Sequence, residues 1–214
     1  MLKTNKEILK EAELALNNKW GKSILVNFTY IAIVLLIVFV KKYELNFLDT
    51  IYRDIIQIVI SLIITGPFCL GLYKYHLSIA RRENPAYVTM FDGFRDFKRA
   101  FIAYILSFIY ATLRLFLLII PGIIAALNYA LIYFILSDDK ELTGSEAILK
   151  SKNMMYGHRK RLFYLTLRFL GLTILSIFTL FIGLLWLIPY SYVAYSIFYE
   201  DVKKQYEEQR IIIE

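Results

Sequence analysis

Two apolar stretches decide the fold: AFIAYILSFIYATLRLFLLIIPGIIAALNYALIYFILS at residues 100–137 and LFYLTLRFLGLTILSIFTLFIGLLWLIPYSYVAYSIFY at residues 162–199. Each contains a single formal charge, Arg114 in the first and Arg168 in the second. One helix of such length would measure about 57 Å, roughly twice the hydrocarbon thickness of a bilayer. Each stretch is therefore predicted to fold back as a helical hairpin.

The turns of these hairpins are expected where a helix breaks most easily. Pro121 and Gly122 meet this need in the first stretch, because proline interrupts helical hydrogen bonding and glycine permits a tight turn. Gly183 is the expected turn of the second stretch. The predicted membrane spans are residues 100–120, 123–137, 162–182 and 184–199.

Two earlier apolar runs, residues 24–40 and 55–80, are each long enough for one further span when flanking lysines snorkel to the interface. The predicted fold class is an all-α integral membrane protein with six transmembrane helices arranged as three hairpins. The first run has no small-residue cleavage site behind it, so it is predicted to be a retained anchor and not a signal peptide.

The composition agrees with a membrane protein. Hydrophobic residues make up 58% of the 214 residues, compared with about 45–50% in soluble domains. The net charge of +7 is explained by loops that face the cytoplasm and anionic lipid, so no nucleic-acid partner is predicted. The single cysteine, Cys69, lies in an apolar run and is interpreted as a buried hydrophobe.

Basic residues are distributed unevenly among the polar segments. The segments 1–23, 81–99, 138–161 and 200–214 hold 19 lysines and arginines, whereas the segment 41–54 holds three. Six spans place the first four segments on one side of the membrane, and the positive-inside rule assigns that side to the cytoplasm. Both chain ends are therefore predicted to be cytoplasmic, in a bacterial plasma membrane.

Three of these segments precede a hairpin, and each is predicted to form an interfacial amphipathic helix. Each contains a threonine followed three residues later by an acid, the pattern of a capping box. An alternative is that the threefold pattern is a coincidence of common tetrapeptides. The three pairs are Thr4 with Glu7, Thr89 with Asp92, and Thr143 with Glu146. The chain is thus treated as one membrane domain, residues 1–214, with paired spans at 24–80, 100–137 and 162–199.

Four residues within the apolar runs are candidates for binding an anionic group, because charge inside a membrane is costly and is kept for a role. Arg114 lies deep in its run, and Asn128 in the next span is the expected partner. Arg168 and Lys74 are the other two candidates, although snorkelling to the interface would also explain them. His76 lies at a similar depth to Lys74.

The helix-break positions are the other functional candidates. They are Pro67, Pro121, Gly122 and Pro189. Transporters use such breaks at binding sites, although most intramembrane prolines only kink a helix. The sequence contains no nucleotide-binding, zinc-protease, esterase or Cys-x-x-Cys motif, so no cofactor, metal or catalytic residue is predicted.

Several of these segments together resemble a known membrane-protein family. It is carried by Pro121-Gly122-Ile123, Leu136-Ser137-Asp138, Glu146-Ala147-Ile148, Met155 with Gly157-His158-Arg159, and Gly183-Leu184-Leu185-Trp186-Leu187-Ile188-Pro189-Tyr190. These residues resemble the bacterial membrane family called domain of unknown function 975. The family is similar in architecture to the membrane domain of some glycerophosphodiester phosphodiesterases. Leu172 departs from the pattern, where a tryptophan is expected. The resemblance implies a multi-pass membrane protein and supplies no activity.

The functional hypothesis is a non-enzymatic membrane protein that binds or moves an amphipathic or anionic small molecule or lipid. Its expected partners are membrane lipids, including anionic headgroups at the cytoplasmic face. The alternatives are an accessory or assembly subunit with a membrane-protein partner and, ranked last, a membrane-embedded enzyme acting on lipid. A polar cavity between the spans would favour the first hypothesis, and a dry core would favour the second.

Overall fold

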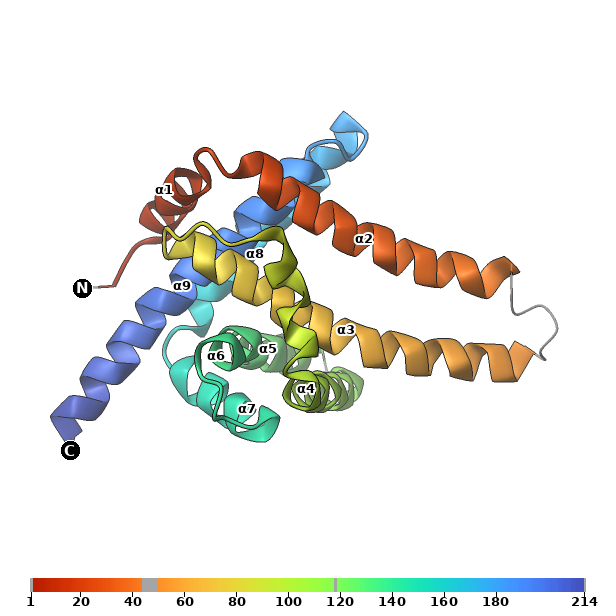
Figure 1. Cartoon of the computed structure of the whole chain (residues 1–214). Helices are drawn as coiled ribbons and strands as arrows, with labels where there is room; N and C mark the ends of the chain where they lie inside the picture. Colours follow the sequence, from red (N-terminus) through yellow and green to blue (C-terminus); the bar gives the residue numbers. More distant parts are fainter. Residues whose placement is uncertain (1, 44–49, 118, 214) are drawn as a thin grey trace.

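The computed structural model describes residues 2–43, 50–117 and 119–213, and these residues are entirely helical or irregular. The prediction of an all-α fold is confirmed. Figure 1 shows the arrangement. The helices are α1 (Asn5–Leu16), α2 (Trp20–Tyr43), α3 (Thr50–Ala80), α4 (Phe97–Leu117), α5 (Ile119–Tyr129), α6 (Ile132–Asp138), α7 (Gly144–Met154), α8 (Arg159–Ser176) and α9 (Leu184–Ile213), with 3₁₀ segments η1 (Tyr87–Phe94) and η2 (Ile177–Thr179).

Both long apolar stretches fold back as the length argument predicts. In the first, α4 and α5 contact each other, and α5 begins two residues before Pro121. Proline is tolerated there because the amides of a first helical turn have no partner within the helix. In the second, α8 and α9 contact each other across a turn in which Leu180 and Phe181 adopt left-handed backbone angles. The predicted turn at Gly183 is confirmed, since α9 begins at the next residue.

The prediction of six spans is wrong, because fewer than six of the described helices are both long enough and apolar enough to cross a membrane. Two helical segments of the described residues are long and apolar enough to cross a membrane, Ile58–Ala80 and Arg159–Thr179. A third is reached if α1 and residues 20–36 of α2, which meet at 96°, count as one broken span.

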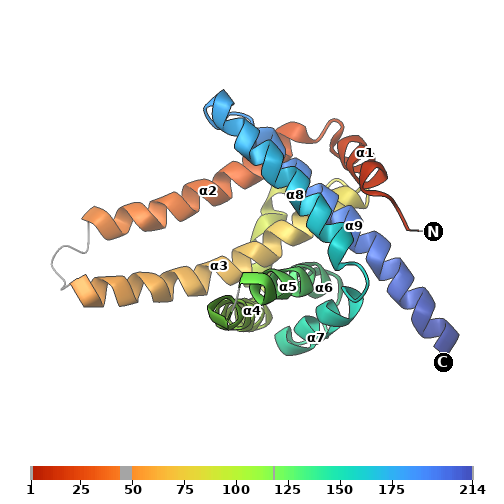
Figure 2. The ribbon, with the colours of Figure 1, turned by 180° about the vertical axis from the view of Figure 1, so that it is seen from behind.

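Three features reduce the count. The apolar helical segment of the predicted fourth span, Gly122–Asp138, is too short to count as a crossing, and Ala130 and Leu131 divide it between α5 and α6. The predicted sixth span has only 16 residues before Glu200, and α9 then continues as a charged helix. The three hairpins also extend from the core in different directions (Figures 1 and 2), whereas six crossings would require a shared axis.

The proline positions do not break the helices as predicted. Pro67 lies inside α3 and Pro189 inside α9. The backbone carbonyl of Pro67 instead packs against Gly93 of η1. A Cβ added at Gly93 would lie 1.9 Å from the carbonyl oxygen of Pro67. Gly122 is buried within α5, and the side chain of Pro121 lies outside the described residues.

The amphipathic segments form two of the three predicted helices. Reciprocal capping boxes are present at Thr4 with Glu7 in α1 and at Thr143 with Glu146 in α7, as predicted. The prediction for residues 81–99 is wrong, because Thr89 lies inside η1, a 3₁₀ segment without a side-chain cap. The apolar stripes of α1 and α7 are buried against the protein, so these helices do not present them to lipid.

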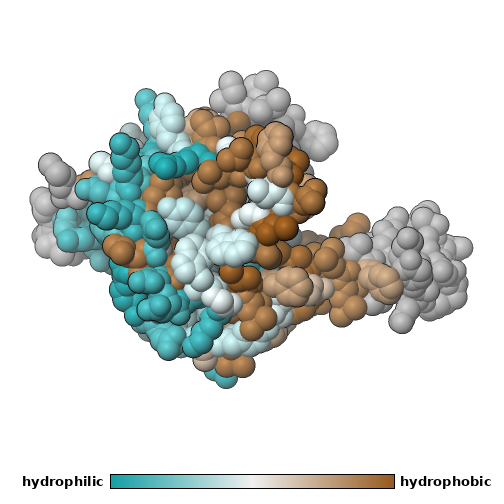
Figure 3. Space-filling view, turned by 90° about the horizontal axis from the view of Figure 1, so that it is seen from above, coloured by the Kyte–Doolittle hydropathy of each residue, from teal (hydrophilic) through white to brown (hydrophobic). Residues whose placement is uncertain are grey.

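Helix α3 is central to the core and contacts α1, α2, η1, α4, α6 and α9. Its last fifteen residues are largely buried, including Phe68, Leu72 and Tyr75. Gly71 lets η1 approach the helix backbone, since an added Cβ would lie 1.9 Å from the carbonyl oxygen of Met90. Beyond this core, α2 and the first half of α3 form an arm with exposed apolar side chains (Figures 1 and 3).

Polar side chains collect at the opposite end of the molecule from this arm (Figure 3). Both described chain ends, α1, α7 and the segment after α3 lie on that side (Figure 1). The chain is therefore divided into a polar end and apolar hairpins. The basic segments share one face, which agrees with the charge distribution in the sequence.

Candidate functional site: a tyrosine-lined cavity

A cavity of about 410 Å³ lies between α2, α3 and α9. Six of its eight lining residues are tyrosines or other polar side chains, and the sequence did not identify them as a group. We call this space the tyrosine cavity. It is lined by Asn27, Tyr30, Ile31, Tyr73, Ile188, Ser191, Tyr192 and Tyr195.

His76 and Asn27 form the polar support of the tyrosine cavity. The Nδ2 of Asn27 lies 3.1 Å from Nε2 of His76 and donates to the carbonyl of Ser23 at 2.7 Å. The other ring nitrogen, Nδ1, lies 2.8 Å from the carbonyl of Leu72. A carbonyl can only accept, so Nδ1 carries the proton and Nε2 accepts from Asn27. The imidazole is therefore neutral, and its hydrogen bonds join α2 to α3.

The aromatic wall of the cavity is built by stacking. The ring of Tyr192 stacks on His76 at 4.7 Å and meets Tyr73 edge-on at 5.4 Å. Aromatic pairs at these separations favour offset or edge-to-face geometry. The hydroxyls of Tyr73 and Tyr192 have no hydrogen-bond partner among the described residues, and Tyr195 has only a long contact of 3.4 Å to Thr166. The wall therefore holds hydroxyls that are free to bind a ligand.

A second cavity, of about 370 Å³, adjoins the first and shares Tyr73 and Tyr195 with it. It lies between α5, α6, α8 and α9, and its other lining residues are apolar apart from Thr166. We call it the tail cavity. Its remaining lining residues are Ile123, Ala126, Leu127, Ala130, Leu131, Phe134, Leu162, Phe163 and Phe198. The pair of cavities matches a molecule with a polar head and an apolar chain.

The electrostatics of the tyrosine cavity are those of a neutral site. None of the residues that line it carries a formal charge. A charged ligand group that left water for this space would lose hydration without a partner of opposite sign, which costs several kcal/mol. The cavity is thus suited to hydroxyl, ester or carbonyl groups.

The geometry can be compared with known proteins. Residues 107–206 match a family described as a protein of unknown function, DUF975. This part of the chain is a DUF975 domain. No curated protein and no solved structure matches the chain. The DUF975 domain supplies Tyr192 and Tyr195, whereas Asn27, Tyr30 and Tyr73 precede it. The cavity is therefore completed by α2 and α3, outside the matched region.

Two of the predicted anion-binding residues are occupied by internal partners. Lys74 forms an ion pair with Asp92 of η1 at 2.6 Å. The Oδ1 of Asn128, inside the DUF975 domain, accepts from Nε of Arg159 at 2.6 Å, and its backbone carbonyl accepts from Ser151. Asn128 therefore links α5 to the start of α8, and its expected pairing with Arg114 involves a side chain outside the described residues.

The other two predicted residues lie on α4 and α8. Arg114 belongs to α4, and its side chain lies outside the described residues. Arg168 is exposed on α8 and forms no ion pair within the described residues. The three candidates with described side chains, Lys74, Asn128 and Arg168, do not contact one another.

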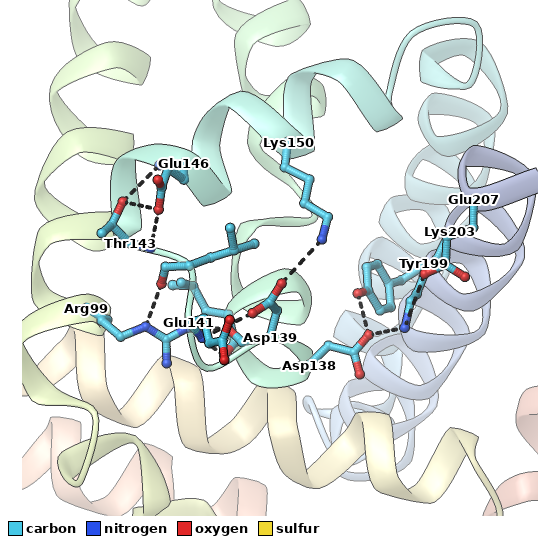
Figure 4. Close-up of polar contacts among 12 residues, drawn as sticks. Arg99, Asp138, Asp139, Glu141, Thr143, Glu146, Lys150, Tyr199, Lys203 and Glu207 are labelled. Carbon is cyan, nitrogen blue, oxygen red and sulfur yellow. Dashed lines mark hydrogen bonds and ion pairs between the residues drawn. The ribbon is translucent and has the colours of Figure 1, made fainter. Parts of the chain in front are cut away.

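Charged residues of the DUF975 domain instead stabilise the polar end (Figure 4). Asp138, the last residue of α6, binds Arg81 at 2.6 Å, Lys203 of α9 and the hydroxyl of Tyr199 at 2.9 Å. Burial by itself would raise the pKa of Asp138, but hydrogen bonds from Lys203 and Arg81 hold that pKa below its usual range. Arg81 also binds Glu200 at 2.7 Å. This network fastens the end of α3 to α6 and α9.

The cavity tyrosines were missed because tyrosine in an apolar run also fits packing or an interface belt. One signal was present: Tyr192 and Tyr195 are three residues apart, and Tyr73 and His76 have the same spacing. Residues three apart share a helix face. The tyrosines of these two faces, on α3 and α9, line the tyrosine cavity.

Proposed function

We propose that the chain is a membrane-embedded binding protein for an amphipathic molecule with an uncharged polar head and an apolar chain. The observation that carries this proposal is that two neighbouring cavities share the lining residues Tyr73 and Tyr195, and that one has polar lining groups while the other is almost wholly apolar. The head would contact the hydroxyls of Tyr73 and Tyr192, and the chain would enter the tail cavity.

The neutral lining narrows the ligand class. An anionic head group has no cation to meet in the tyrosine cavity, whereas free tyrosine hydroxyls donate to hydroxyl and carbonyl oxygens. We therefore propose a neutral amphiphile, such as an acylglycerol, in place of an anionic one. The role we propose is binding or transfer and not catalysis, in a bacterial plasma membrane that the apolar hairpins enter.

The two or three helices that are apolar enough to cross a membrane support this setting. Exposed apolar side chains on the α2–α3 arm and at the α8–α9 turn are sites that only lipid or another apolar surface would cover. The cavities lie where these hairpins meet, so a ligand could enter from the bilayer without passing through the polar end.

The experiment is a thermal-stability titration of the purified chain in detergent with monooleoylglycerol and, separately, with oleate. Monooleoylglycerol should raise the melting temperature in a saturable way, and oleate should need an at least tenfold higher concentration. A shift with oleate at equal concentration, or no shift with monooleoylglycerol, would contradict the proposed ligand class.

Variants locate the binding. Tyr73→Phe with Tyr192→Phe removes both free hydroxyls and should weaken binding about tenfold, since each neutral hydrogen bond contributes about 0.5–1.5 kcal/mol. Ala130→Phe fills the tail cavity and should remove binding. Tyr164→Phe, at an exposed tyrosine of α8, is the matched control and should bind as the unmodified chain does.

A further inference from the structure

A separate apolar groove of about 280 Å³ lies on the outside of the α8–α9 hairpin. It is bounded by the chain's two tryptophans, Trp20 of α2 and Trp186 of α9, and its floor includes Gly183 and Ser176. Leu172 and Leu175 of α8 complete one side and are exposed. The groove therefore lies on a lipid-facing surface and shares no lining residue with the tyrosine cavity or the tail cavity.

One end of the groove has a cation nearby. Arg168 precedes Leu172 by four residues and Leu175 by seven, so all three lie on one face of α8. Arg168 also acts electrostatically on Tyr190, a residue of the groove whose ring is tilted relative to that of Trp20, with ring centroids 6.4 Å apart. Glu13 acts on the same tyrosine but lies outside ion-pair distance of Arg168.

The groove runs from the side of the polar end toward the apolar turn, which is the direction that a bilayer lipid would take. Helix α8 begins at the polar end with Arg159, Lys160 and Arg161, and it runs toward the apolar turn after Ser176 (Figure 2). Side chains on a helix point back toward its N-terminus, so the guanidinium of Arg168 extends toward the polar end while the groove extends toward the turn. A head group at Arg168 would thus continue as a chain along the groove.

Arg168 has no ion pair among the described residues, and it is the cation of α8 that precedes the groove residue Leu172 by about one helical turn. Arg159 binds Asn128, and Arg161 forms an ion pair with Asp201. A guanidinium in this position matches a phosphate, which it can bind through two parallel hydrogen bonds. We propose that the groove between Trp20 and Trp186 binds one acyl chain of an anionic phospholipid of the bilayer, whose phosphate is bound by Arg168.

The test measures retention of phosphatidylglycerol by the purified chain with native mass spectrometry, with phosphatidylcholine as the zwitterionic comparison. The unmodified chain should retain one phosphatidylglycerol in preference to phosphatidylcholine. Arg168→Gln should lower its retention about fivefold, the factor that corresponds to a contribution of about 1 kcal/mol from one cation near an anionic surface. Arg168→Lys should keep part of the retention, because the charge remains and the bidentate geometry is lost.

Lys160→Gln is the matched control, since Lys160 is an exposed cation of the same helix that does not adjoin the groove. It should leave retention unchanged. An equal loss in Lys160→Gln and Arg168→Gln would overturn the site, because it would show only a general attraction to a basic surface. Equal retention by Arg168→Gln and the unmodified chain would also overturn it.

A second arm separates lipid from free phosphate. Leu172→Trp fills the groove and leaves Arg168 in place, and it should lower phosphatidylglycerol retention. Glycerol phosphate, which lacks an acyl chain, should stabilise the unmodified chain far less than phosphatidylglycerol does. Equal stabilisation by the two compounds would show that the groove holds no chain and would contradict the proposal.

Discussion

The two halves of α3 have similar apolar sequences and opposite surroundings. In the outer half, residues 50–65, Ile55, Ile58 and Ile63 are exposed. In the inner half, residues 66–80, Phe68 and Leu72 are buried in the core. Hydropathy alone does not separate the two halves, because lipid chains and protein cores are equally apolar. The difference arises from small residues that let other backbones approach the inner half.

Substitution of a glycine in the inner half of α3 should have the largest effect on stability. Gly71→Ala places a Cβ 1.9 Å from the carbonyl oxygen of Met90, so η1 must move away from α3. We expect the free energy of unfolding to fall by about 3 kcal/mol or more, which is the upper range for overpacking. Denaturation in mixed micelles, followed by circular dichroism, measures it.

Gly21→Ala is the control for this substitution, since nothing lies within 4 Å of the added Cβ. It should change the unfolding free energy by at most about 1 kcal/mol, which is the difference in helix propensity between the two residues. Similar losses at both glycines would show that close approach of η1 does not distinguish the inner half.

Truncation of apolar side chains should follow the same division with a smaller effect. Leu72→Ala removes a side chain with 0% exposure and should lower the free energy of unfolding by about 2 kcal/mol, the lower end of the range for truncating a buried leucine. Ile58→Ala removes one with 58% exposure and should cost less than about 0.5 kcal/mol in detergent. Equal costs would mean that the outer half is also packed against protein.

The ion pairs that follow the inner half should give the smallest effect. Asp138→Asn removes the carboxylate that pairs with Arg81 and Lys203. The free energy of unfolding should fall by about 1–2 kcal/mol at pH 7, since this carboxylate is only partly buried. The pKa of Asp138 in the folded chain lies below its unfolded value of about 3.9. The stabilisation is therefore present above about pH 4 and is lost as the pH falls through the folded-state pKa.

Melting temperatures between pH 3 and pH 7 measure this contribution. The unmodified chain should lose more stability on acidification than Asp138→Asn does, so their difference should shrink as the pH falls. A difference that stays constant over this range would show that the charge of Asp138 does not stabilise the polar end.

Much of the fold followed from the sequence because it depends on local chemistry and length. The two hairpins, the Thr4 and Thr143 capping boxes and the shared polar face could all be predicted. The span count could not, because Ala130–Leu131 interrupts a run whose composition is uniformly apolar. The 3₁₀ form of η1 depends on Gly71 and Gly93, whose packing partners are distant in sequence.

The candidate site was less predictable for the same reason. Charge inside an apolar run directed attention to Lys74, and to Asn128 as the expected partner of Arg114, yet Lys74 and Asn128 both have other partners within the chain. The tyrosine cavity is built from neutral side chains of three helices, and their meeting depends on how α2, α3 and α9 cross. Only the spacing shared by Tyr73 with His76 and by Tyr192 with Tyr195 was visible in the sequence.

We propose that the outer half of α3 contacts lipid, whereas the inner half contacts protein near the polar end. Spin labels at single cysteines replacing Ile58 and Leu77, in a Cys69→Ser background and reconstituted in vesicles, test it most directly. The label at 58 should be mobile, accessible to oxygen and shielded from a water-soluble nickel chelate, and the label at 77 should be immobile and shielded from both. Chelate access at position 58, or oxygen access at position 77 equal to that at 58, would contradict the account.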